Sequence, residues 1–323
     1  MEHSNSDHFN GKVFFNPWTR KKQTLGDVYK MLTTRKLNEW PKWVENKKFP
    51  SLSTVADSGE VVLTFVNHVT FLIQASGLNI LTDPHWGMRT SPVSWAGPKR
   101  HRDPGVKFSD LPEIDLVLIS HNHYDHMDHE TILKLEETFS PVFVTSLGNK
   151  TLLEKWGCKK VFEMDWWDQK QFPDKGDGTI IHFVPSQHFS ARGPFDRNRT
   201  LWGGFVIGTQ DKKIYFAGDT GYGPQFKMIR ERLGKMDISL LPIGAYEPQW
   251  FMSLVHVNPE EAVQAHIDLE SELSIGMHHG TFQLTEEAID APIIDLDKAR
   301  KKLSVDQAKF FVLDEGDCFK ARF

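Results

Sequence analysis

The segment from Ser120 to Asp128 constrains this chain most, because it places three histidines and a carboxylate within six residues. It directly follows the apolar run 115–119, which is typical of a buried strand. Packing several imidazoles together without a cation is costly, since each loses water and repels its neighbour when protonated. The segment therefore predicts a metal site, with a solvated polar loop as the alternative. Side chains at alternating positions beyond a strand point the same way. The converging candidates are His121, His123 and Asp125, with His126 at a neighbouring point.

Later segments add candidate ligands, most of them at the end of an apolar run. These are His188, Asp219, His256 and His278. Taken singly, a histidine after a strand is also typical of a core or rim residue, but the shared placement favours a single site. The two cysteines, Cys158 and Cys318, lack the paired spacing of a zinc knuckle. Nitrogen and oxygen atoms are therefore the expected metal ligands.

The body of the chain has a layered α/β pattern, in which short apolar runs alternate with helical patterns. The predicted strands are Val61–Val66, Val69–Gln74, Asn79–Leu81, Leu116–Ile119, Val142–Thr145, Gly204–Gly208, Ile214–Ala217, Ile238–Pro242 and Ile275–His278. The predicted helices are Glu130–Glu137, Gly148–Lys155 and Pro259–Leu269. We divide the 323 residues into an N-terminal extension, 1–57, and a body, 58–323.

Neither a membrane-spanning helix nor a secretory signal is expected. The longest apolar stretch, Val61–Thr82, is interrupted by Asn67, His68, Gln74 and Asn79 and so indicates strands. Met1–Asn10 is polar and lacks the apolar core of a signal peptide. These features favour a cytoplasmic protein, either soluble or peripherally attached to a membrane.

The charge distribution bears on the partners. A net charge of −5 argues against nucleic acid, whose phosphates attract basic surfaces. Residues 1–57 carry +4, and the remainder carries −9. Together with Trp18, Trp40 and Trp43, this basic extension suits contact with an anionic membrane surface. The alternative is that these tryptophans pin the extension to the body.

Further motifs resemble those of a known family. They are Asn16-Pro-Trp18, Thr82-Asp-Pro84, Gly97-Pro-Lys-Arg100, Gly218-Asp-Thr-Gly-Tyr222, Gly244-Ala-Tyr-Glu-Pro248, the run 256–262 and Gly280-Thr-Phe282. Together with the His-x-His-x-Asp-His run, they resemble the metallo-β-lactamase superfamily. Within that superfamily, they resemble the branch of N-acyl-phosphatidylethanolamine-hydrolysing phospholipase D. The resemblance covers roughly residues 60–290 and implies a four-layer αββα sandwich.

The resemblance also implies a site with two divalent ions. It assigns one ion to His121, His123 and His188, the other to Asp125, His126 and His278, and a bridging role to Asp219. Such ligands suit zinc, with iron or manganese as alternatives. His279 stands where the family commonly has tryptophan, and is therefore an alternative to His278 as a ligand. Catalytic roles fall to Asp125 and His256, and substrate contacts to Tyr124 and His256.

The implied reaction is hydrolysis of N-acyl-phosphatidylethanolamine to N-acylethanolamine and phosphatidic acid, by attack of metal-bound hydroxide on phosphorus. His256 is the candidate neighbour of the leaving alkoxide. Metal occupancy should fall below about pH 6, because imidazole ligands must be deprotonated. Two alternatives remain: another hydrolase of the superfamily, acting on a lactone or a soluble phosphodiester, and a non-catalytic metal or lipid sensor. The expected partners are the phospholipid, a membrane surface and a second copy of the chain in a homodimer.

Overall fold

The computed structural model describes residues 6–19, 23–47, 50, 52, 60–172, 178–209 and 211–321. The predicted boundary between residues 57 and 58, and the first half of Met1–Asn10, lie outside the described residues.

In the described part of the chain, two seven-stranded sheets form the centre of the molecule. The first contains β1 (Val61–Asn67), β2 (Thr70–Ala75), β3 (Leu78–Thr82), β4 (Leu116–Ile119), β5 (Val142–Ser146), β6 (Val161–Met164) and β14 (Cys318–Ala321). The second contains β7 (Gln169–Phe172), β8 (Thr179–Val184), β9 (Gly204–Gly208), β10 (Lys213–Phe216), β11 (Ile238–Pro242), β12 (Leu273–Met277) and β13 (Phe310–Val312). The strand orders are β14-β1-β2-β3-β4-β5-β6 and β13-β12-β11-β10-β9-β8-β7.

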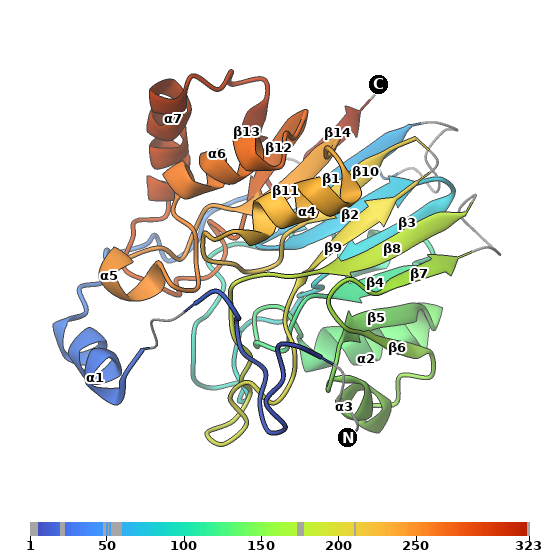
Figure 1. The fold of residues 1–323 in the computed structure, drawn as a ribbon, viewed down its shortest axis with the longest axis horizontal. Coiled ribbons are helices and arrows are strands. Elements are labelled where there is room, and N and C mark those ends of the chain that lie inside the picture. Colours follow the sequence, from blue (N-terminus) through green and yellow to red (C-terminus); the bar gives the residue numbers. More distant parts are fainter. Residues whose placement is uncertain are drawn as a thin grey trace.

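Helices cover both outer faces of the stacked sheets (Figure 1). Those of the body are α2 (His129–Phe139), α3 (Lys150–Lys155), α4 (Gln225–Leu233), α5 (Gln249–Met252), α6 (Pro259–Asp268) and α7 (Ala291–Leu303). The extension contributes α1 (Leu25–Thr34), and a short 3₁₀ turn covers Phe108–Asp110. The predicted four-layer αββα sandwich is confirmed. Of the helices described, none combines the length and the apolar character that crossing a bilayer requires.

Strand β4 shows how the sequence specifies these layers. Leu116 and Leu118 face the core between the two sheets, whereas Val117 and Ile119 pack with residues of α2 and α3. A strand that is buried on both faces is apolar throughout, which explains the continuous apolar runs in the sequence. All twelve predicted elements occur, with ends within two residues of the predicted ones.

The described part of the extension lies against the body. The Asn16 side-chain amide donates to the carbonyl of His188 at 2.9 Å, and the Trp18 indole donates to Gln187 Oε1 at 3.0 Å. The Trp40 indole donates to the carbonyl of Glu287 at 2.8 Å. Trp18 and Trp40 thus make the contacts expected if they pin the extension to the body.

Parallel pairing brings several chain segments to one edge of the sandwich. Strands β3 and β4 run parallel in the first sheet, and β10, β11 and β12 run parallel in the second. The carboxyl ends of parallel strands meet at the same edge of a sheet, which is where side chains from distant segments can form a site.

Candidate metal centre

The loop after β4 carries four of the predicted ligands, and it folds back on itself. The backbone N–H groups of His126 and Met127 both donate to the carbonyl of His123, at 3.1 and 2.9 Å. Asp128 then caps α2, with its carboxylate accepting the Thr131 N–H at 3.2 Å. The loop is therefore fixed between a buried strand and a capped helix.

His121, His123 and His188 form the first group of ring nitrogens. His123 Nδ1 lies 2.8 Å from His121 Nε2 and 3.2 Å from His188 Nε2. His188, which follows β8, has its Nδ1 2.8 Å from the carbonyl of Val255. Because a carbonyl only accepts, the ring proton of His188 belongs on Nδ1, and Nε2 is left as a ligand atom. Ligands at ~2.1 Å around a tetrahedral zinc are about 3.4 Å apart, so these separations suit one ion.

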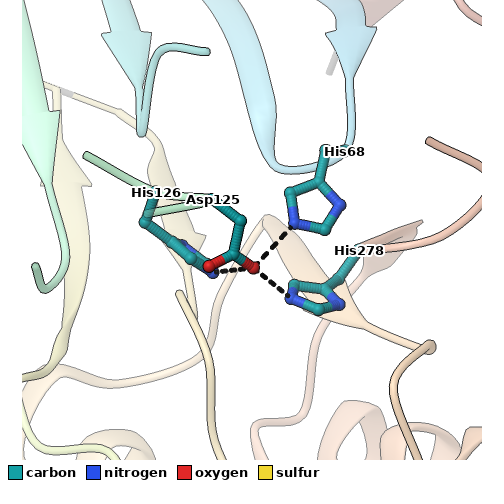
Figure 2. A group of neighbouring side chains, drawn as sticks. All are labelled: His68, Asp125, His126 and His278. Carbon is teal, nitrogen blue, oxygen red and sulfur yellow. Dashed lines mark hydrogen bonds and ion pairs between the residues drawn. The ribbon is translucent and has the colours of Figure 1, made fainter. Parts of the chain in front are cut away.

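Asp125, His126 and His278 form the second group, which Figure 2 shows together with His68. Asp125 Oδ2 lies 3.4 Å from His126 Nε2 and 3.5 Å from His278 Nε2. His278 follows β12, so this group combines ligands from both sheets. Its backbone lies close to that of Gly244, where an added Cβ would come 2.0 Å from the His278 carbonyl oxygen. Only glycine at that position allows this close approach.

Asp219, which follows β10, lies between the two groups. Its Oδ2 is 3.1 Å from His126 Nε2 and 3.6 Å from His188 Nε2. Its Oδ1 is 3.1 Å from His278 Nε2. The structure therefore brings together all seven side chains that the resemblance assigns to metal binding, with Asp219 in contact with both groups.

The first group is prepared for metal binding by its burial. Removal from water lowers the pKa of His123 to about 4 and that of His188 to about 3. Burial likewise holds the pKa of His121 well below its usual range. These imidazoles are neutral at physiological pH, and neutral imidazole is the form that binds metals.

In the second group the pKa values of the imidazoles are raised rather than lowered. Burial also acts to lower the pKa of His126 and His278, but the carboxylates of Asp219 and Asp125 outweigh it. The pKa of His278 rises to about 9, and that of His126 lies well above its usual value. Burial acts to raise the pKa of Asp219, yet these imidazoles hold it well below the ordinary range. At neutral pH, protons on this group neutralise carboxylates in the way that a cation would.

A cavity of about 250 Å³ opens onto the ligands. It is lined by Gln23, Val28, His123, Asp125, Phe189, Arg197, Asp219, Ala245, Phe251, Met252, Val255, His256, Leu284 and Thr285. His256 Nδ1 lies 3.9 Å from Asp219 Oδ2, and burial lowers the pKa of this imidazole to about 3. His256 is therefore a neutral ring in the lining of the cavity.

Two other sequence-derived candidates lie elsewhere. Tyr124 lines a neighbouring cavity rather than the one over the ligands, and its hydroxyl donates to the carbonyl of Arg192 at 2.8 Å. As the residue between His123 and Asp125, it points to the other side of the loop. The His279 ring stacks on Phe65 with centroids 5.9 Å apart, and it belongs to none of the metal-binding groups among the described residues.

The sequence interpretation missed two buried side chains that hold ligands. Asp83, which follows β3, lies with its Oδ2 2.6 Å from His126 Nδ1, and its Oδ1 accepts the Ser120 N–H at 2.7 Å. A carboxylate behind a ligating histidine fixes its ring and proton. His68 lies with its Nε2 3.1 Å from Asp125 Oδ2. Two features of the sequence could have indicated these residues. The Thr82-Asp-Pro84 motif contains Asp83, and His68 is a polar residue that interrupts an apolar run.

The comparisons with known proteins agree with this geometry. Residues 78–279 match the family described as Beta-lactamase superfamily domain. The chain is 34% identical, over 97% of its length, to N-acyl-phosphatidylethanolamine-hydrolyzing phospholipase D 1 of Caenorhabditis elegans, and covers 93% of that protein. It is 36% identical, over 66% of its length, to the mitochondrial N-acyl-phosphatidylethanolamine-hydrolyzing phospholipase D of Saccharomyces cerevisiae, and covers 46% of it.

A solved structure shares the fold. Igni18, a metallo hydrolase from Ignicoccus hospitalis KIN4/I, superposes with a TM-score of 0.61 at 24% identity, covering 82% of this chain and 99% of that chain. The sequence match, the two sheets and the grouped ligands lead to one conclusion: the chain is a metal-dependent hydrolase that belongs to the metallo-β-lactamase superfamily, in the family of the nematode protein.

Proposed function

We propose that this chain is a phospholipase D that hydrolyses N-acyl-phosphatidylethanolamine to N-acylethanolamine and phosphatidic acid. The mixed lining of the cavity over the ligands carries the proposal. It combines ligand side chains and His256 with the apolar side chains of Val28, Phe189, Phe251, Met252 and Leu284. A phosphodiester that bears acyl chains presents the same two kinds of surface. The names of the nematode and yeast relatives support this substrate.

The ligand set fits two divalent ions, for which we propose zinc, with iron or manganese as alternatives. Among the described residues, His126 Nε2, His278 Nε2 and Asp219 Oδ1 are buried and make ion-pair contacts but no hydrogen bond. Buried polar atoms that converge without hydrogen bonds are the fit expected of ligand atoms. When bound, two such ions supply a water that ionises near neutral pH and neutralise charge on the phosphate oxygens.

The protein's own side chains serve the reaction in distinct ways. Hydrolysis joins a water oxygen to phosphorus and breaks the bond between phosphorus and the ethanolamine oxygen, which takes up the proton that the water loses. Asp125 lines the cavity as an anion, so its carboxylate can accept a hydrogen bond that orients the water. His256, as a neutral ring, donates a hydrogen bond to the leaving oxygen. The Arg197 guanidinium, 4.0 Å from the centroid of the Phe189 ring, supplies a positive charge at the cavity wall for the phosphate.

The substrate assignment is tested by turnover of the metal-loaded protein. Vesicles that contain N-acyl-phosphatidylethanolamine should release N-acylethanolamine, and a panel of small lactones and a soluble phosphodiester should be poor substrates. Exhaustive chelation should abolish release, and zinc should restore it, because the water nucleophile needs the ions. Turnover of a lactone without lipid hydrolysis would indicate another hydrolase of the superfamily. Two tightly held ions without turnover of any substrate would indicate a sensor.

The role of His256 is tested by the variant His256→Ala. Turnover should fall by about 100-fold, because the leaving oxygen loses a hydrogen-bond donor, while the metal content stays at its original value. The control is His266→Asn, since the buried His266 bonds to Ser274 Oγ at 2.8 Å, away from the ligands. Unchanged turnover in His256→Ala, at equal metal content, would remove this residue from the mechanism.

We also propose a membrane contact, and assign it to two loops beside the site: the loop after β3 that carries Trp95, and the loop between β8 and β9 that carries Phe195. Trp95 and Phe195 are 80% and 86% exposed. Val93 and Arg192 line one cavity, so the two loops are neighbours. The same loops expose cations, namely Lys99, Arg197 and Arg199. Exposed aromatics beside cations suit an anionic lipid surface. Trp18 and Trp40 are occupied by contacts with the body, which favours the loops over the extension.

Vesicle sedimentation tests this membrane contact. The double variant Trp95→Ser, Phe195→Ser should bind anionic vesicles about tenfold or more weakly, because two apolar side chains no longer leave water. The matched control is Tyr29→Ser, Leu32→Ser, which removes two exposed apolar residues of α1. If the control loses binding and the loop variant keeps it, the extension carries the contact instead.

The two ions should differ in their dependence on pH. Below about pH 9 His278 carries a proton when no ion is bound, so the second ion must displace it, and its affinity falls as the pH falls. His123 and His188 stay neutral until the pH approaches about 4 and about 3. The first ion is therefore held to lower pH. Elemental analysis after dialysis at fixed free zinc, from pH 9 to pH 5, should show stepwise loss.

Single variants assign the two steps of that titration. His121→Asn disrupts only the first group, so its remaining ion, bound by the second group, should be lost at the higher pH. Asp125→Asn disrupts only the second group, so its remaining ion, bound by the first group, should be retained to lower pH. Loss of both ions in one step from the unmodified chain would contradict the difference between the groups.

A further inference from the structure

We propose that His68 is a positioning residue that holds ligands of the second ion from both sheets, Asp125 through its ring and His278 through its main chain. It lies in the turn between β1 and β2 and is 1% exposed. The inference rests on the two-ion site proposed above, and does not depend on the lipid substrate.

The main chain of His68 reaches the second sheet. Its carbonyl accepts the His278 N–H at 2.7 Å, and its own N–H donates to Thr281 Oγ1 at 3.0 Å. It adopts a φ of +48°, which a residue with a side chain rarely adopts. Such backbone conformations persist where the surroundings hold them, and they concentrate at functional sites. The turn therefore fixes the loop that carries His278.

The ring of His68 reaches the first sheet. Its Nε2 lies 3.1 Å from Asp125 Oδ2, the oxygen that also faces His126 and His278 (Figure 2). An anionic carboxylate only accepts, so the proton of His68 belongs on Nε2. His68 Nδ1 is buried without a partner among the described residues. That nitrogen then has no proton, which avoids a buried N–H group without an acceptor.

The geometry favours a positioning role over direct binding to the ion. His68 lies within ligand distance of Asp125, His126 and His278, but its Nε2 proton is donated to Asp125, which leaves no lone pair on that nitrogen for an ion. Asp125, His126 and His278 already supply the three protein ligands of a catalytic zinc that keeps one position open. A carboxylate oxygen has lone pairs for both an ion and an N–H donor. His68 can therefore orient Asp125 without occupying a coordination position. Loss of such a partner typically lowers metal affinity by about 10- to 100-fold.

Two substitutions at this position separate the ring contact from the backbone. His68→Asn tolerates the left-handed backbone, but its amide lies at the level of Nδ1 and does not reach Asp125. His68→Gln places an amide N–H at the level of Nε2 and can donate to the carboxylate. The matched control is His85→Asn. His85 is buried and packs on the same Phe282 ring, with centroids 4.9 Å apart, but neither of its ring nitrogens has a partner among the described residues.

The experiment measures metal content after dialysis, and titrates zinc against a competing chromophoric chelator. The unmodified chain and His85→Asn should bind two ions alike. His68→Asn should keep the ion of the first group, and bind the second about 10- to 100-fold more weakly. His68→Gln should recover most of that loss. Thr281→Val, which removes the acceptor of the His68 N–H, should also lower the affinity for the second ion, while thermal unfolding remains cooperative.

Three outcomes would overturn the proposal. His68→Asn could hold the second ion as tightly as the unmodified chain, or His68→Gln could be as defective as His68→Asn. Fewer than two ions on the unmodified chain would remove the two-ion site, and this inference with it. If His68→Asn does not fold, the comparison of Thr281→Val and His68→Gln with the unmodified chain decides. Failure of lipid turnover with two ions bound would overturn the substrate alone.

Discussion

The contacts of Asp219 with ring nitrogens on both sides organise the site. This carboxylate is 3% exposed, and burial alone would favour its neutral form, yet the imidazoles of His126 and His278 hold its pKa well below the ordinary range. A buried charge is tolerated only when it is compensated. Protons on those imidazoles can compensate it, and divalent ions can replace the protons. The fold must therefore deliver ligands from β4, β8, β10 and β12 to one point, which the common edge of two stacked sheets achieves.

Orientation of the ligands depends on a surrounding layer of partners from distant segments. Asp83 fixes the ring of His126, the Val255 carbonyl fixes the proton of His188, and Asn16 in the extension binds the backbone of His188. The first two hydrogen bonds fix the ring of a histidine ligand, and the third fixes the backbone of His188. Metal affinity in such sites depends on these partners as well as on the ligands. The site therefore extends from the N-terminal extension to the loop after β12.

The sequence was informative where a local pattern determines the structure. Strands buried on both faces gave continuous apolar runs, and the spacing of His121, His123 and Asp125 gave the cluster. Strands β6, β7, β8, β13 and β14 were not predicted. Strand β7, for example, lies at a sheet edge, and its residues, Gln-Lys-Gln-Phe, show no apolar run. The contact of His68 with Asp125 joins residues 57 positions apart, so sheet pairing determines it rather than local spacing. Tyr124 shows the reverse case: it lies between two candidate ligands in the sequence, but its hydroxyl donates to the carbonyl of Arg192 and its side chain lines a neighbouring cavity.

The extension illustrates how a structural role and a surface role can be confused. Removing residues 1–50 would delete basic residues and aromatics that suit a membrane, but it would also delete Asn16 and Trp18. Asn16 donates to the backbone carbonyl of His188, and Trp18 donates to the side chain of Gln187. Gln187 in turn donates to the carbonyl of Leu254 beside the cavity. A truncated chain would therefore lose support for a metal ligand and for the cavity wall at once. Point substitutions on exposed side chains separate lipid contact from site integrity, because they leave those internal hydrogen bonds intact.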